Sequence, residues 1–409
     1  MTQIRSTLRN STPLPSLLVV GSMGALLDEL RRAGDPSADA VVEELARTEQ
    51  IRAVSPILRH LVDNDQPVPE ELPRSIALWL DETAQLPAWV QRDRFERGCR
   101  LVVEHGPQVC VVLATASLVY CYAGYPGVKV LTFSRRLDHD AVRRVGETAQ
   151  FVLSVMAPGS LESSGRGIRK IQKVRMLHAA IRHLVTASHR WDLEADGAPI
   201  CQEDLLGTLM SFSSIVVDAL RKLGVRIDDE EAEDYYSRWR AIGEMLGIDP
   251  AAIPPDLASA RELTDLIAQR NHRRSEEGIE MTRALFDLHA DSLPPGFAGA
   301  APALTRYLVG DEVCGLVDLP RTRWDRNIRW QAGVGRALDR VQSARGPIGS
   351  LTKLIGAGML NQRVAEMAGG RSASFSIPIP HELERSWTAS GVFPAIDNEL
   401  IQLAQAQPA

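Results

Sequence analysis

The stretch IRKIQKVRMLHAAIRHLVTAS, residues 168–188, indicates one long helix. It contains neither glycine nor proline, and apolar side chains recur three and four positions apart, as at Ile171, Val174 and Ile181. A loop rich in glycine and serine, 159–167, precedes it, and residues 137–156 before that loop show the same helical spacing. The pattern favours two antiparallel helices joined by this loop.

The rest of the chain follows the same pattern, and the alternating spacing of β-strands is nearly absent. Further helices are predicted at 35–62, 72–83, 92–105, 106–128, 200–223, 228–246 and 255–277, around 305, and at 330–344. The tail from 372 contains Pro378, Pro380 and Pro394 and is expected to be irregular. The sequence thus predicts an all-α protein with a core at 86–345, an N-terminal helical extension at 1–85 and a partly irregular C-terminal extension at 346–409.

The segment 106–128 carries no formally charged side chain and is long enough to cross a bilayer. It also contains Pro107, Thr115, Ser117 and Pro126, which suit the buried centre of a large all-α protein better than a membrane span. We therefore expect a buried helix here and no stable membrane span.

The composition and the first residues argue against several kinds of partner and against export from the cell. Lys and Arg number 46 against 52 Asp and Glu, a net charge of −6 without a block of like charge, which offers no footprint for nucleic acid. The five cysteines form no CxxC pair, which argues against a disulfide framework, a structural zinc site and covalently attached haem. Residues 1–30 do not resemble an export signal, because Gly21 and Gly24 interrupt the apolar stretch. We expect a cytoplasmic protein.

His178 has the most informative surroundings of the nine histidines. Arg175 and Arg182 lie three residues before it and four after it, so the three side chains share one helix face. Two cations beside an imidazole disfavour a zinc ion, but they suit haem b, which has a metal at its centre and carboxylates at its edge. The alternative is a core histidine on a helix with a basic edge. His183, close by, is a further candidate for contact with the haem edge.

The loop between the two helices predicts what faces His178. If the helices are antiparallel about a loop centred near 163, position 147 or 148 lies opposite His178. Glu147 and Thr148 stand there, with Arg144 one turn earlier. This polar edge opposite a histidine resembles a distal pocket, and the alternative is a polar network that joins two helices.

Several motifs occur in an order that resembles the bacterial rubber oxygenase (latex clearing protein) superfamily, whose fungal relatives include the oxygenase of mycophenolic acid biosynthesis. The resemblance runs from about Leu86 to about Asp311. Its motifs are Tyr120-Cys-Tyr-Ala-Gly, Arg136-Leu137, Arg144-Val-Gly-Glu-Thr148, Val174-Arg-Met-Leu-His178-Ala-Ala-Ile-Arg182, Gln202-Glu-Asp-Leu-Leu-Gly-Thr208 and Tyr235-Tyr-Ser-Arg-Trp-Arg240. The resemblance implies a globin-like helical core that holds b-type haem through one histidine.

The resemblance also assigns residues. The family's proximal histidine falls on His178, with its two nearby arginines on Arg175 and Arg182. Its distal arginine and threonine fall on Arg144 and Thr148. A further threonine and arginine near the haem fall on Thr208 and Arg306.

The sequence departs from the family at two positions. Glu147 stands where rubber oxygenases have a distal lysine that can bind the iron, and Val128 stands where they have a glutamate proposed as the catalytic base. The rubber-cleaving site is therefore incomplete, and rubber itself is not the expected substrate.

The sequence leaves three alternative functions open. The first is a haem b oxygenase that uses O2 on an apolar, unsaturated or isoprenoid-like small molecule, with Arg144, Glu147 and Thr148 as catalytic residues and oxidative C=C cleavage or a related oxygenation as the reaction. The second is a haem-binding sensor or carrier that has lost this reaction, and the third is a helical binding protein without haem. The sequence does not indicate an oligomeric state.

Overall fold

The computed structural model describes residues 23–133, 137–292 and 298–326. Within these ranges the regular secondary structure consists of helices, joined by turns and loops, and an isolated bridge between Gly124 and His272. The helices are α2 (Met23–Arg32), α3 (Pro36–Arg47), α4 (Ile51–His60), α5 (Arg74–Glu82), α6 (Arg92–Arg97), α7 (Arg100–Val112), the π-helix η1 (Leu113–Ser117), α8 (Leu118–Ala123), α9 (Gly127–Phe133), α10 (Leu137–Val155), α11 (Gly167–Ala187), α12 (Leu193–Asp196), α13 (Gln202–Phe212), α14 (Ser214–Lys222), α15 (Asp229–Met245), α16 (Leu257–Asn271), α17 (Glu276–Ser292) and α18 (Ala300–Leu316). The predicted all-α class is confirmed. The predicted helix at 330–344 and the tail from 372 lie outside the described residues.

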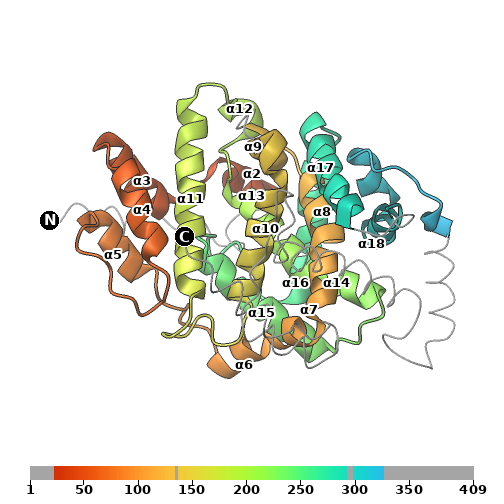
Figure 1. Ribbon diagram of the computed structural model, residues 1–409, viewed down its shortest axis with the longest axis horizontal. Helices are drawn as coiled ribbons and strands as arrows, with labels where there is room; N and C mark the ends of the chain where they lie inside the picture. The colour runs from red at the N-terminus through yellow and green to blue at the C-terminus, as the bar shows by residue number, and fades with distance from the viewer. Residues whose placement is uncertain (1–22, 134–136, 293–297, 327–409) are drawn as a thin grey trace, which may run out of the picture.

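Helix α11 has neighbours on both sides (Figure 1). Helices α3, α4 and α5 lie on one side, where Met176 and Ala179 of α11 join their apolar cluster. Helix α10 packs on the other side, and Ile171 belongs to the large apolar core built from α2, α7, η1, α10 and α13–α16. The α10–α11 hairpin thus joins the two parts of the protein.

Aspartate side chains begin several helices. Asp35 caps α3 by accepting a hydrogen bond from Ala38 N, and Asp228 caps α15 by accepting one from Glu231 N, as the sequence predicted for both starts. The predicted helix at 200–223 is wrong in one respect, since it divides into α13 and α14 at Ser213, whose backbone is not helical (φ −112°, ψ −84°).

The uncharged segment also differs from its prediction. Helix α7 does not end at Gly106-Pro107 but kinks at His105 (φ −126°, ψ 25°) and continues through η1 into α8. The kink accommodates Pro107, which lacks a backbone donor and clashes with the preceding turn. The run Arg92–Ala123 is long and apolar enough to cross a membrane, and 67% of its apolar window is buried inside the protein. This burial agrees with the interpretation as a core segment.

The N-terminal segment packs closely on the predicted core. Leu26, Leu27 and Leu30 of α2 are buried in the large apolar cluster. The backbone at the end of α2 also bonds to the core: Arg31 O, in the last turn of α2, accepts from Ala198 N, and Ala33 O, just after α2, accepts from Gln202 N. The boundary at 85/86 stays a prediction, but residues on its two sides share one apolar core.

A buried histidine on α17 makes the stability of the protein depend on pH. His289 is 2% exposed, its ring lies against Phe286, and no hydrogen bond reaches either ring nitrogen among the described residues. Burial lowers the pKa of His289 to about 3. Between these two pKa values, the histidine of the unfolded chain, with a pKa near 6.5, binds a proton, whereas His289 in the folded chain stays neutral.

We expect the free energy of unfolding to fall as the pH drops below about 6.5, by about 2.5 kcal/mol from this residue between pH 7 and pH 4.5. Urea unfolding of the wild type and of His289→Leu between pH 7 and 4.5 measures the effect, which the variant should lack. The exposed His60 on α4 supplies the control variant His60→Leu. Equal pH slopes for the wild type and His289→Leu would contradict this expectation.

Candidate functional site

Helix α11 carries His178 between two different flanks. With 3.6 residues per turn, Arg175 and Arg182 fall on one side of His178, and Val174 and Ile181 fall on the other. The His178 side chain is half-buried, and its Nδ1 atom is shielded from solvent. An imidazole thus stands at the border between a basic flank and an apolar flank.

One hydrogen bond between the helices of the hairpin relates the register of α10 to that of α11. Lys170 on α11 donates a hydrogen bond to Ser154 Oγ on α10 (2.5 Å), which fixes one facing pair of the two helices. Eight residues further along α11 and eight back along α10, the facing positions are His178 and Gly146. Glu147 and Thr148 are the next residues on α10, where Glu147 is exposed and Thr148 half-buried. The side chain of Arg144, one turn earlier, lies outside the described residues.

Among the described residues, no apolar cluster covers the middle of the apolar flank around His178. Ile171 belongs to the large core, and Ile181 and Val185 belong to a small cluster at the other end of α11. Between them, Val174 and Leu177 belong to none of the apolar clusters that the described residues form.

Two leucines on this flank are unusually accessible. Leu177 is 55% exposed and Leu184 is 66% exposed, although α11 lies in the middle of the protein (Figure 1). Exposed apolar surface of this kind is typical of a ligand site or a contact surface. The turn of α11 that carries His178 therefore offers an apolar surface beside an imidazole.

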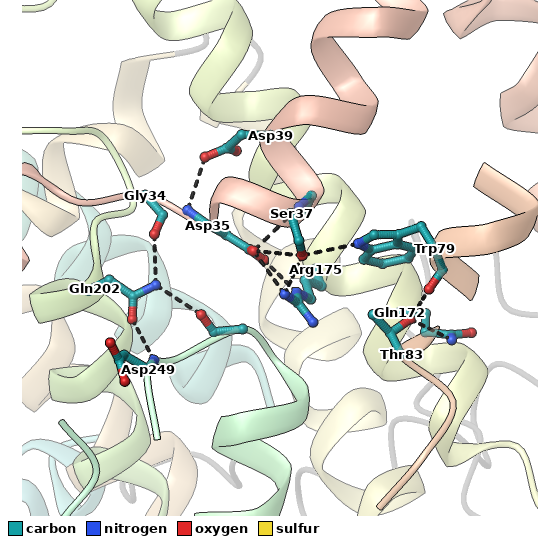
Figure 2. A network of polar contacts seen from close by, with 12 residues as sticks. Gly34, Asp35, Ser37, Asp39, Trp79, Thr83, Gln172, Arg175, Gln202 and Asp249 are labelled. Carbon is teal, nitrogen blue, oxygen red and sulfur yellow. Dashed lines mark hydrogen bonds and ion pairs between the residues drawn. The ribbon is translucent and has the colours of Figure 1, made fainter. Parts of the chain in front are cut away.

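The basic flank is engaged by α3. Arg175 donates from Nε and Nη2 to the two carboxylate oxygens of Asp35 (2.5 and 2.8 Å), and Nη2 also donates to Ser37 Oγ (2.7 Å; Figure 2). Arg182 donates from Nε to Asp39 (2.8 Å) and from Nη1 to the carbonyl oxygen of Ile200 (2.7 Å). Asp35 and Asp39 therefore accept hydrogen bonds from the two guanidinium groups that were expected, from the sequence, to bind haem propionates.

One donor on the basic flank is left over. The Nη2 atom of Arg182 is shielded from solvent, and no hydrogen bond reaches it among the described residues. A buried charged donor is costly without a partner, so this atom is a candidate for binding an acceptor that the described residues do not supply. Arg182 retains a donor for a ligand carboxylate, whereas the Nε and Nη2 atoms of Arg175 are both engaged by the protein.

The other predicted site residues lie elsewhere. His183 is half-buried on a different face of α11, five residues beyond His178. Thr208 is exposed on α13 and donates to Asp204 O (2.9 Å). Arg306 on α18 is 6% exposed; it binds Asp311 of the same helix (3.0 Å) and, in the segment after α18, Leu319 O (2.5 Å) and Asp325 (3.2 Å). None of these bonds reaches α11, and the assignment of Thr208 and Arg306 to haem stays a prediction.

Sequence reasoning missed the acidic residues of the site. Asp35 was recognised only as a helix start, and Asp39 was not singled out. Both lie about 140 residues before their arginine partners. The spacing Asp35-Pro-Ser-Ala-Asp39 is the one available signal, because it places two carboxylates on one face of the first turn of a helix.

A separate group of potential metal ligands lies at the kink of α7. One ligand atom from each of Glu104, His105 and Glu231 lies within 4.8 Å of the others. Burial raises the pKa of Glu231, as does the charge of Glu104, while Arg100 lowers it. The positive charge of Arg100 opposes a cation here, so this group carries no functional assignment.

The comparisons with known proteins define first a fold and then a family. The structure matches the solved "Structure of Latex Clearing Protein LCP in the closed state" with a TM-score of 0.72 and 22% identity, over 85% of this chain and 95% of that one. The fold is thus that of an all-α latex clearing protein.

A rubber oxygenase of Streptomyces sp. (strain K30) is 26% identical over 290 residues, which cover 70% of this chain and 71% of the relative. Residues 108–376 match the family described as "ER-bound oxygenase mpaB/B'/Rubber oxygenase, catalytic domain". Because this match covers most of the chain, the protein belongs to that oxygenase family. The matched range begins and ends later than the predicted core at 86–345.

Proposed function

We propose that this protein is a haem b-dependent oxygenase that acts with O2 on an apolar, unsaturated or isoprenoid-like small molecule. The observation that carries the proposal is the surroundings of His178 on α11. The imidazole lies between an uncovered apolar flank and Arg182, which retains one buried donor. An iron ligand, an apolar contact surface and a carboxylate anchor are the three groups that haem b requires of a protein.

The residues present fit haem with one change from the sequence prediction. His178 would bind the iron, Val174 and Leu177 would contact the porphyrin face, and Arg182 Nη2 would bind a carboxylate. Arg175 fits this role less well, because Asp35 and Ser37 already accept from its Nε and Nη2 atoms. Bound haem supplies an iron centre able to bind and reduce O2.

The chain's own residues on α10 would complete the site. Thr148, half-buried near the position opposite His178, can donate its hydroxyl proton in a hydrogen bond toward the open side of the haem. Glu147, exposed beside it, can take up a proton from solvent and deliver it there. The apolar flank would exclude water from the substrate and select for hydrocarbon.

One observation favours a second candidate, a haem-binding sensor or carrier without oxygenase activity. Val128 stands where the resembling family has a glutamate, and it is 1% exposed in an apolar cluster with Tyr122 and Met281. A base at this position would have to be ionised among apolar side chains, which is unfavourable. The reaction therefore depends on residues of α10 or does not occur.

Two measurements test the proposal. Absorption spectra of the purified protein, reconstituted with haem b, should show a Soret band that shifts when CO is added after reduction with dithionite. Turnover of alkene-containing lipids under O2 then separates the oxygenase from the sensor. Failure to bind haem at stoichiometric concentration would refute both, and binding without turnover of any lipid in a broad panel would favour the sensor.

We expect Glu147→Gln to keep the haem content and CO binding of the wild type and to slow turnover by roughly tenfold or more, because the amide cannot relay a proton. Glu147→Lys should convert the spectrum toward a six-coordinate form, since a neutral amine can bind the iron. Glu162→Gln, an exposed glutamate in the hairpin loop, is the control. If Glu147→Gln turns over at the wild-type rate, Glu147 has no part in the reaction.

A further inference from the structure

The α3–α11 interface contains two ion pairs that bracket His178. Arg175 and Arg182 lie one turn before and one turn after His178, and each binds a different aspartate of α3. The Arg175–Asp35 pair is well buried, with side chains 13% and 3% exposed, and the Arg182–Asp39 side chains are 7% and 26% exposed. Both ends of the two-turn segment that carries His178 are therefore fastened to α3.

The two carboxylates are themselves fixed in place (Figure 2). The backbone N–H of Asp35 donates to Asp39 Oδ2 (2.9 Å), and Asp35 Oδ1 accepts from Ala38 N as the cap of α3. Gln202 holds the chain on either side, because its Nε2 donates to the carbonyl oxygens of Gly34 (2.7 Å) and Gly247 (2.9 Å). Because these hydrogen bonds hold the two aspartates, a movement of Arg175 or Arg182 would break its ion pair rather than carry the aspartate with it.

Glycines on both sides allow this close approach. A Cβ atom on Gly34 would lie 2.6 Å from Asp39 Oδ2, and one on Gly247 would collide with Asp35 and with Arg175. Gly247 also has a φ of +87°, which side-chain-bearing residues rarely adopt. The backbone around the pairs is thus shaped to admit them.

The geometry determines how α11 presents its histidine. A helix held by one ion pair can rotate about its axis or slide, but two pairs seven residues apart on nearly the same face oppose both movements. Each pair is only partly solvated, so it is screened less than a surface pair. His178 lies between the two fastening points, on the border of the same face.

We propose that Asp35 and Asp39 are positioning residues for the haem site: by binding Arg175 and Arg182 they fix the rotation of α11 and so the direction of the His178 imidazole. This rests on the proposed role of His178 in binding haem. The N-terminal segment is then part of the cofactor site, although it precedes the matched family domain.

The test compares Asp35→Asn and Asp39→Asn with Asp63→Asn. Asparagine caps a helix as well as aspartate does, so Asp35→Asn removes the charge and spares the cap. Asp63 forms an exposed ion pair with Arg166 (2.7 Å) just before α11 and supplies the matched control. Asp35→Glu and Asp39→Glu restore the charge.

Two readouts are needed. In the haem-free protein, hydrogen exchange of peptides covering 174–182 should quicken by about tenfold or more in the two Asn variants and not in the control. In the haem-bound protein, haem loss to apomyoglobin should quicken by about tenfold or more, with a shifted Soret band. The Glu variants should recover both. Circular dichroism confirms that the variants are folded, and Arg175→Lys, which keeps the charge but loses the bidentate bond, replaces any variant that is not.

The outcomes separate the two proposals. Unchanged exchange, or faster exchange with unchanged haem loss and spectrum, would overturn the positioning role. If the wild type takes up no haem, the proposed function fails, and the exchange experiment alone then decides whether the ion pairs fix this turn of α11.

Discussion

If His178 binds the iron as proposed, His178→Ala should lose haem b entirely at micromolar concentration while its helical content stays that of the wild type. His178 is half-buried on a helix whose ends are packed in separate clusters, so truncation of its side chain disturbs little of the core. A bound iron would, however, lose its imidazole ligand at the turn of α11 where the apolar flank and the buried Nη2 donor of Arg182 meet. Haem titration followed at the Soret band, together with far-ultraviolet circular dichroism, measures both effects.

His183→Ala provides the control for this variant. His183 is also half-buried on α11, but it points to a different face. It should keep haem at the wild-type stoichiometry, which would also remove His183 from the predicted cofactor contacts. Retention of haem by His178→Ala, or its loss from both variants, would contradict the assignment of the iron ligand.

We expect Arg238→Met to lose about 3 to 5 kcal/mol in the free energy of unfolding, the largest loss of the variants considered. The guanidinium group of Arg238 is completely buried on α15. It donates to the carbonyl oxygens of Val155 (2.8 Å) and Ala157 (3.2 Å), where α10 runs into the hairpin loop, and to Ser160 Oγ (3.0 Å) in that loop. Methionine fills similar volume but removes all of these hydrogen bonds from a buried site, and only weaker support is left, from Ser160 Oγ to Val155 O (3.0 Å) and from Ser160 N to Ala157 O (3.2 Å).

Arg240→Met, two residues further on, is the matched control. Arg240 is half-buried and lies 4.1 Å from the ring of Trp89 at the edge of the protein, so its replacement should cost less than about 1 kcal/mol. Urea unfolding of both variants gives the comparison. Equal midpoints would show that Arg238 does not hold the loop between α10 and α11.

These two variants distinguish a residue that binds the cofactor from a residue that stabilises the fold. His178 is expected to matter for the cofactor and little for folding, whereas Arg238 is expected to matter for folding and, through the loop, for the register of the hairpin. The further proposal on Asp35 and Asp39 lies between them, because these residues would act on the direction of His178 without contact with haem.

The sequence determined much of the local structure. Apolar side chains at helical spacing located α5, α10, α11 and α15 to within a few residues, and they located the start of α3, because this signal depends on neighbours in the chain. The helix spacing also placed Arg175, His178 and Arg182 on one face, whereas the position of Glu147 and Thr148 opposite His178, inferred from the hairpin loop, stays a prediction. It missed α2 and α17 as separate helices.

The tertiary structure alone decided what the arginines bind. Arg175 and Arg182 were expected to hold a ligand, but α3, about 140 residues earlier in the chain, brings Asp35 and Asp39 to them. Helix periodicity states which side of α11 a residue faces and carries no information on which distant helix covers that side. The pairing depends on the apolar contact of α3–α5 with Met176 and Ala179. It also depends on the close approach of the chain at Gly34 and Gly247. Both are contacts between distant parts of the chain, which form only in the folded protein.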